Sequence, residues 1–152
     1  MKTLTLLAAL TMAVVSLPGC VSVGGGTFYK PSEGFQPKKT YNVSVDTLWQ
    51  KINLVLQSER ISVVSSDKAG GRIITDYVEG PTQMQLVGSP LTTRYKYNIT
   101  LNKLSDSETS LMIICTLESS SEGIPWHDVS KDNQGIVSNL ENWLYEQIEK
   151  SI

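Results

Sequence analysis

The stretch that decides the fold runs from Thr93 to Leu117 and reads TRYKYNITLNKLSDSETSLMIICTL. Its first half alternates an apolar set with a polar set, namely Tyr95, Tyr97, Ile99 and Leu101 against Arg94, Lys96, Asn98 and Asn102. A period of two puts each set on its own face of a strand. Turn-forming residues follow at 105–108, and 109–117 then returns as a second strand. The stretch therefore predicts an antiparallel hairpin with one covered face and one face in water.

The segment before this hairpin predicts three more strands and a helix. Residues 40–45 alternate and are β-branched, which favours a strand, and 60–65 and 72–78 have the same character. Between the first two strands, Asp46 is a reasonable N-cap for a helix that ends near Ser58. Its apolar residues recur at helical spacing: Val45, Leu48, Trp49, Ile52, Val55 and Leu56.

The segment after the hairpin predicts a long amphipathic helix over 129–150. One stripe is apolar, and the opposite side carries Glu141, Glu146 and Glu149. Trp49 and Trp143 would hold the two helices to the sheet. Two amphipathic helices need one apolar sheet face to cover. We therefore expect an α+β fold for 40–152, a two-layer sandwich in which an antiparallel sheet carries two helices on one face, in the order β-α-β-β-β-β-α.

The N-terminus has the features of a secretion signal. Lys2 precedes a short apolar stretch over 4–15, which is shorter than the roughly 20 residues of a membrane-spanning helix. Leu17-Pro18-Gly19-Cys20 then resembles the bacterial lipobox. That resemblance implies that a signal peptide of residues 1–19 is removed and that Cys20 carries diacylglycerol and an N-acyl chain. Residue 21 is Val and not Asp, which favours the outer membrane over the inner one.

Residues 20–39 are expected to form a flexible tether behind the lipidated Cys20. Three consecutive glycines at 24–26 and two prolines argue against regular structure. The tether also carries three aromatic residues: Phe28, Tyr29 and Phe35. They form either a partner-docking segment that orders on binding or a segment that folds back on the domain.

Two further regions are candidates for contact with a partner. The loop 80–92 holds four apolar residues that either pack under the domain or form a contact patch: Met84, Leu86, Val87 and Leu91. The wet face of the sheet carries three basic residues, for which a solvated surface is the favoured interpretation: Arg72, Arg94 and Lys96.

Composition and residue types argue against several classes of function. With 13 basic and 15 acidic residues, the chain has no basic excess for nucleic acid. After lipidation only Cys115 remains, in the middle of a strand on the apparent buried face, so no intramolecular disulfide is expected. The single histidine, His127, lacks obvious partners for a metal site or a catalytic pair, and Asp128 is available to cap the last helix. We therefore expect that the protein is not an enzyme and that it binds no metal and no cofactor beyond the lipid on Cys20.

Residues 45–80, VDTLWQKINLVLQSERISVVSSDKAGGRIITDYVEG, resemble a known family. A helix with an early Trp, an I-x-V strand, an Asp, a Gly turn and G-R-I-I-T are similar to the helix-grip domains of the BamC family. BamC-like proteins are lipoproteins of the machine that assembles outer-membrane β-barrels. The resemblance implies a helix-grip-like domain and a non-enzymatic accessory role.

These observations lead to two functional expectations. The first is a lipoprotein anchored in the bacterial outer membrane, facing the periplasm, whose domain binds another envelope protein. The second is a small periplasmic carrier that holds an apolar ligand or lipid between helix and sheet.

Overall fold

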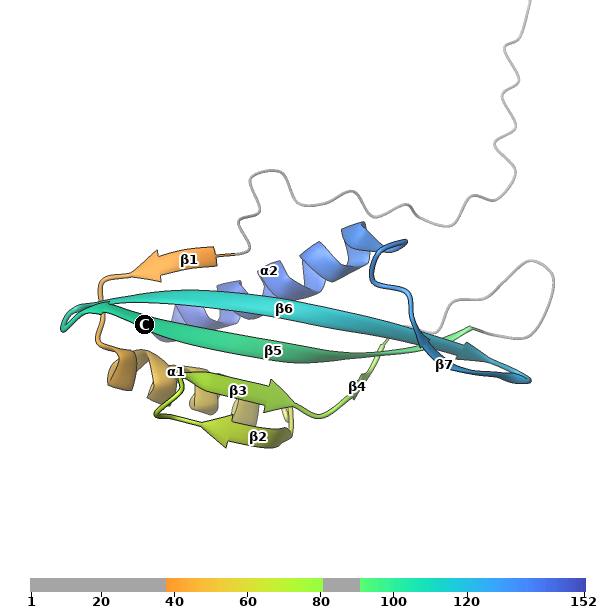
Figure 1. The fold of residues 1–152 in the computed structure, drawn as a ribbon, viewed down its shortest axis with the longest axis horizontal. Helices are drawn as coiled ribbons and strands as arrows, with labels where there is room; N and C mark the ends of the chain where they lie inside the picture. The colour runs from red at the N-terminus through yellow and green to blue at the C-terminus, as the bar shows by residue number, and fades with distance from the viewer. Residues whose placement is uncertain (1–37, 81–90) are drawn as a thin grey trace, which may run out of the picture.

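The computed structural model describes residues 38–80 and 91–152. Within these ranges the elements, shown in Figure 1, are β1 (Lys38–Tyr41), α1 (Val45–Ser58), β2 (Val63–Asp67), β3 (Arg72–Thr75), β4 (Val78–Glu79), β5 (Thr92–Ser105), β6 (Glu108–Ser121), β7 (Ile124–Asp128) and α2 (Gln134–Ser151). The predicted hairpin is confirmed as β5 and β6, which pair from Thr92 and Ser120 at one end to Ser105 and Glu108 at the other.

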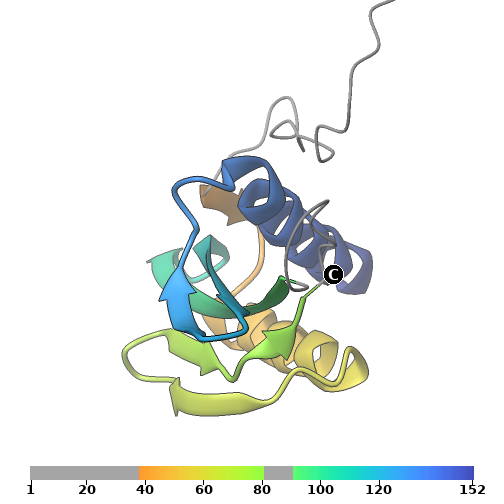
Figure 2. The ribbon, with the colours of Figure 1, turned by 90° about the vertical axis from the view of Figure 1, so that its right-hand side faces the viewer.

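One antiparallel sheet holds these strands together. Its order is β1-β6-β5-β3-β2, with β4 added to β5 and β7 added to β6. Both helices lie on the same side of the sheet, as Figure 2 shows, and they also contact each other. The fold is therefore the predicted α+β two-layer sandwich. The predicted strand over 72–78 is divided into β3 and β4, and β7 comes in addition to the strands predicted.

The core lies between the sheet and the two helices. Alternate residues of the hairpin are buried in it, among them Ile99 on β5 and Ile113 on β6, which pair directly. The expected roles of the two tryptophans are confirmed, because Trp49 is buried in the core and Trp143 packs against it. Full burial of each large aliphatic side chain contributes about 1.5–3 kcal/mol, so this layer is the main source of stability.

The start of α1 differs from the prediction. Ser44, and not Asp46, is the N-cap, and its Oγ accepts a hydrogen bond from the backbone N of Thr47 at 3.2 Å. Asp46 lies in the first turn, where its carboxylate faces the positive end of the helix dipole and pairs with Lys68 at 2.7 Å. Both residue types suit an N-cap, and the earlier one occupies it.

The start of α2 also differs from the predicted Val129. Residues 124–128 form β7, and the N–H of Val129 still donates to the carbonyl of Leu117 on β6 at 2.9 Å. The chain thus stays bound to the sheet edge before the helix begins at Gln134. Asp128 does not cap α2; its Oδ1 accepts from the N–H of Ser130 at 2.8 Å and closes a turn.

Side chains around α2 complete the outer edge of β6. Strand β1 covers this edge at residues 109–112 and β7 covers it at 118–121. Where the pairing with β1 ends, the hydroxyl of Tyr145 donates to the carbonyl of Leu111 at 3.1 Å and accepts from the N–H of Ile113 at 3.0 Å. The N–H of Leu117 donates to Ser130 Oγ at 2.9 Å. The helix and its approach thus take the place of a strand along this part of the edge.

Glu141 belongs to the same arrangement, which corrects the prediction that it lies on the polar side of the helix. It is only 7% exposed, and its Oε1 accepts a hydrogen bond from the backbone N of Cys115 at 2.8 Å. Burial raises the pKa of Glu141 above its usual 4.5, although the Cys115 N–H opposes the shift. The helical spacing of apolar residues could not predict this burial, because the burial depends on the edge of β6, where the N–H of Cys115 needs an acceptor.

Two substitutions separate the acceptor role of Glu141 from its charge. Glu141→Ala should lower the free energy of unfolding by about 2 kcal/mol, because it leaves the Cys115 N–H buried without a partner. Glu141→Gln keeps an acceptor and removes the charge, so it should be at least as stable as the parent at pH 7. Urea unfolding of the three proteins measures both effects.

The pH dependence of this difference has a definite sign. The raised pKa means that the folded state binds the Glu141 proton more tightly than the unfolded state, so the parent loses stability relative to Glu141→Gln as pH rises above about 4.5. Cys115, Tyr97 and Tyr145 are the other titratable groups around this carboxyl. A difference that stays constant between pH 4 and pH 8 would contradict this account.

Candidate functional site

Cys115, the candidate nucleophile that the sequence offered, lies in the interior and is not reactive. Cys115 is 3% exposed, and burial, assisted by the charge of Glu141, raises the pKa of its thiol far above the usual range. A buried thiol of this kind behaves as a small hydrophobe. The predicted burial of Cys115 is confirmed.

His127 does not form a pair with this thiol. It lies on β7 opposite Ser119, which is four residues from Cys115 along β6. At about 3.3 Å per residue, this separation is roughly 13 Å. The His127 ring instead lies 3.1 Å from the carbonyl of Pro125 through Nδ1. Within residues 38–80 and 91–152, no group of three or more His, Cys, Asp or Glu side chains gathers in a way that could hold a metal ion.

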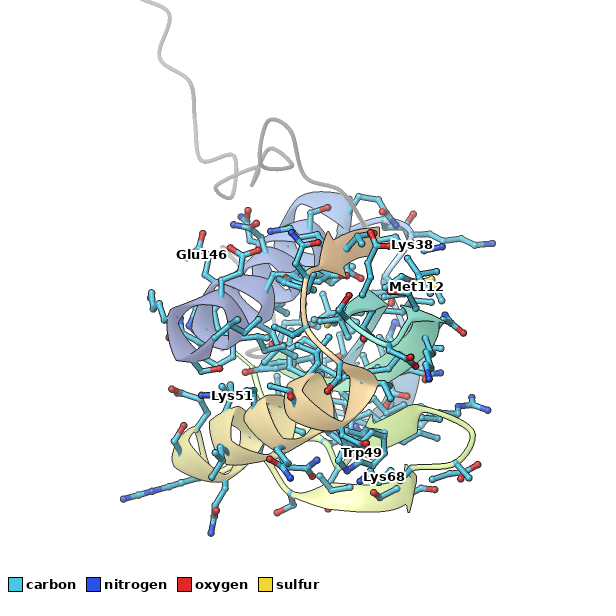
Figure 3. All side chains as sticks on the ribbon, turned by 90° about the vertical axis from the view of Figure 1, so that its left-hand side faces the viewer. Lys38, Trp49, Lys51, Lys68, Met112 and Glu146 are labelled. Atoms are coloured by element: carbon cyan, nitrogen blue, oxygen red, sulfur yellow. The ribbon has the colours of Figure 1, made fainter. Side chains whose placement is uncertain are left out.

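The face of the sheet opposite the helices carries the most distinctive surface. We call it the open face and define it by the residues that alternate with the core on three strands: Arg72 and Ile74 on β3; Arg94, Lys96, Asn98 and Thr100 on β5; Met112, Ile114, Thr116 and Glu118 on β6. Figure 3 shows Met112 on this side of the sheet and Glu146 on the outer side of α2, across the molecule. Ile114, at the middle of β6, is 46% exposed.

One end of the open face holds an arginine stacked between two aromatic rings. The guanidinium carbon of Arg94 lies 3.9 Å from the ring centre of Tyr77 and 4.2 Å from that of Trp126. Lys96 Nζ lies 4.6 Å from the same Tyr77 ring. Three segments far apart in sequence thus meet here, because Tyr77 precedes β4, Arg94 is on β5 and Trp126 is on β7.

Glu118 fixes this stack from β6. Arg94 donates from Nε to Glu118 Oε2 at 2.8 Å and pairs with it from Nη2 at 2.7 Å, while the hydroxyl of Tyr77 donates to Oε1 at 2.5 Å. Desolvation acts to raise the pKa of Glu118, but the hydrogen bonds from Tyr77 and Arg94 outweigh it and lower the pKa. The carboxylate therefore stays charged, and the stack is held in one geometry without a ligand.

The sequence indicated only part of this arrangement. Arg72, Arg94 and Lys96 were predicted on a wet strand face, and the structure places them there. Tyr77, Glu118 and Trp126 were missed. The sequence could have placed Glu118 on the open face, because this residue continues the alternation of buried and exposed positions along β6. Its partner, however, depends on the exact register of the hairpin.

Among the contact residues proposed from the sequence, Leu91 is the one that the described ranges include. It is half-buried and lies immediately before β5. Cys20 and the remaining candidates lie outside the described residues: Phe28, Tyr29, Phe35, Met84, Leu86 and Val87. In the ranges that the structure covers, no helix is long and apolar enough to cross a membrane.

The fold and this surface define an α+β domain with one open sheet face. No protein-family model and no curated protein matches the chain. Among solved structures, it is similar to a DUF4468 family protein from Bacteroides ovatus, with 12% sequence identity and a TM-score of 0.38. The match covers 75% of this chain and 77% of that one. A similarity this distant implies nothing about the function of this chain.

Proposed function

We propose that this chain is a non-enzymatic lipoprotein, anchored through acylated Cys20 to the outer membrane and facing the periplasm, whose domain binds another envelope protein. The observation that supports it best is the open face, where an exposed aliphatic centre lies beside a preformed Tyr77–Arg94–Trp126 stack. The resemblance to the BamC family suggests envelope or β-barrel assembly as the process served.

The composition of the open face favours a protein partner. Trp, Tyr and Arg are the residue types that dominate binding energy at protein interfaces. Trp126 is 39% exposed, and the ion pair with Glu118 already holds the stack in place. A partner would therefore bind it without the entropic cost of ordering these side chains.

A carrier for an apolar ligand or lipid is the second candidate. It requires room between helices and sheet, and the described part of that interface is filled by a continuous cluster of buried side chains. A surface hollow near the start of α2 is lined by charged residues: Asp128, Lys131 and Asp132. These observations favour the protein-binding function. Native mass spectrometry of the Cys20→Ser chain tests the carrier, because a co-purifying lipid would support it.

In-cell photo-crosslinking tests the protein-binding function. A benzoylphenylalanine at Ile114 of the full lipidated chain should give adducts with another protein, because this position lies in the middle of the open face. The matched control is Leu54, which is 59% exposed on α1 and should give few adducts. If neither position gave a protein adduct, the proposed function would be contradicted. Adducts from Leu54 alone would keep the function and move the docking site to the helix layer.

A further inference from the structure

The middle of the open face is aliphatic. Ile114 on β6 pairs with Asn98 on β5, which pairs with Ile74 on β3, and Met112 lies two residues before Ile114 on the same side of β6. Ile114 is 46% exposed, and Ile74 and Met112 are partly exposed. The uncovered face of an antiparallel sheet is normally polar. We call Ile74, Met112 and Ile114 the aliphatic centre.

The charges around the aliphatic centre balance. The register places Asp67 beside Arg72 at one end of the open face. At the other end Arg94 has Glu79 beside it on β4 and Glu118 beside it on β6. Charge therefore does not select the occupant of the aliphatic centre, and its apolar surface must be matched by apolar groups.

The chain enters the domain at the margin of this surface. Lys38, the first described residue, pairs with Met112. The next residue, Lys39, pairs with Glu149 on α2 at 2.8 Å and so faces the helix layer. Neighbouring residues of a strand point to opposite faces, so Lys38 lies on the open side. Figure 3 shows Lys38 and Met112 on the same side of the domain.

The residues before Lys38 have no free edge on which to continue β1. The N–H groups of Ile113, Cys115 and Leu117, which follow on β6, already donate to side chains of α2 and of the segment that leads to it. Pro37 also has no N–H with which to extend the pairing. The pairing with β6 thus ends at Lys38, and α2 occupies the other face of the sheet beside it. The apolar surface next to this point is the aliphatic centre.

The aromatic residues of the tether are close enough in sequence to reach the aliphatic centre. Phe35 precedes Lys38 by three residues, which span up to roughly 10 Å. Strands about 4.8 Å apart, with roughly 3.3 Å per residue, place the Cα of Ile114 about 8 Å from that of Lys38. Phe28 and Tyr29 precede Lys38 by ten and nine residues, a span of up to roughly 30 Å. The same spacings put the far side of the aliphatic centre, on β3, only about 16 Å from Lys38.

We infer that the tether docks on its own domain, where the aromatic side chains of Phe28, Tyr29 and Phe35 cover the aliphatic centre of the open face. These residues lie outside the described ranges, and the place where the chain enters the domain carries the inference. Residues 21–37 contain one Lys and one Glu, so the segment brings no net charge to a face whose charges balance.

The covalent connection favours the tether over any separate molecule. Aromatic side chains bury about 150–250 Å² each, so three of them supply a large apolar contact. A short flexible connection holds them at an effective concentration of about a millimolar or more. The contact forms within the chain whether or not a partner exists, so the inference goes beyond the proposed function. A partner that binds the open face would have to displace the tether.

Photo-crosslinking of the isolated protein tests the contact. The full lipidated chain with a benzoylphenylalanine at Ile114 is reconstituted into vesicles of phosphatidylethanolamine and phosphatidylglycerol. Mass spectrometry should find a link from this position to a peptide within residues 28–37. A mixture of isotope-labelled and unlabelled chains should give no mixed pair, because the link forms within one chain. The matched control is Leu54, which is 59% exposed on α1 and should give no link to the tether.

Substitutions in the tether test which side chains make the contact. Replacing all three aromatic residues with Ser should reduce the Ile114 link at least tenfold, and in cells it should raise the Ile114 adduct with another protein at least twofold. The matched control is Val21→Ser with Val23→Ser, which removes apolar side chains from the same tether and should change neither readout. Thermal unfolding of each variant checks that the domain stays folded.

The outcomes separate this inference from the proposed function. The absence of a link from Ile114, an equal link from Leu54, a link to residues 81–90, a mixed-isotope pair, an adduct with lipid alone or insensitivity to the Ser substitutions would each overturn the inference. An Ile114 adduct with another protein in cells, without the link to the tether, would overturn it while the proposed function stood. The link to the tether with no protein adduct in cells from either position would support the inference and contradict the proposed function.

Discussion

Replacing Gly71 with Ala is expected to lower the free energy of unfolding by at least about 3 kcal/mol. Gly71 has a φ of +64°, a conformation that costs a residue with a Cβ roughly 1–2 kcal/mol. An added Cβ would also lie 2.2 Å from the backbone carbonyl oxygen of Leu101, which cannot move aside as a side chain can. The Leu101 N–H donates to the Gly71 carbonyl at 2.7 Å, so any shift of the turn also breaks this bond between the turn and β5.

Gly123→Ala is the matched control. Gly123 has a similar φ of +76°, but nothing lies within 4 Å of the place where its Cβ would be. For this variant the free energy of unfolding should fall by only about 1 kcal/mol, the cost of holding alanine at a positive φ. Urea unfolding with a common m-value measures both variants. Equal losses at the two positions would show that the close approach of β5 to the turn contributes nothing.

Replacing Cys20 with Ser should release the protein from membranes. Each buried CH₂ of an acyl chain contributes about 0.8 kcal/mol, and stable anchoring takes more than one chain. Serine carries no thioether-linked diacylglycerol, so the anchor would be lost as a whole. Fractionation of the envelope, together with mass spectrometry of the N-terminal peptide, measures the effect.

The control for this change is the other cysteine. Cys115 is buried in the core, so Cys115→Ala should leave membrane attachment intact and lower stability modestly. A Cys20→Ser protein that remained in the membrane fraction after a carbonate wash would refute the lipobox interpretation and the proposed anchoring with it.

Much of the fold follows from local patterns that the chain carries in a contiguous form. The alternation over residues 93–103 predicted which face of β5 is buried, and Tyr97 and Ile99 are fully buried as expected. The helical spacing around Trp49 and Trp143 placed both helices on the core. These predictions hold because a strand's period of two and a helix's period of 3.6 depend on neighbours in sequence alone.

The candidate site depends on register, which local patterns do not determine. Ser105 pairs with Glu108 across a two-residue turn. If the pairing continued from this turn without interruption, Arg94 would pair with Ser119. The irregularity between Lys103 and Ser105 shifts the register by one, so Arg94 pairs with Glu118 instead. A shift by one residue changes the face on which a partner lies. The ion pair that holds the stack therefore exists only because of this irregularity.

The sequence by itself determined that two helices cover one face of an antiparallel sheet and that Cys115 is buried within it. Only the tertiary structure decided that Glu141 and Tyr145 complete the edge of β6, and that Tyr77, Arg94 and Trp126 meet on the open face. The edge of β6 and the stack could not be predicted from the sequence for the same physical reason. Burial of a face is set by the spacing of neighbouring residues, whereas an edge that needs a partner, or a stack of rings, depends on segments that become neighbours only after folding.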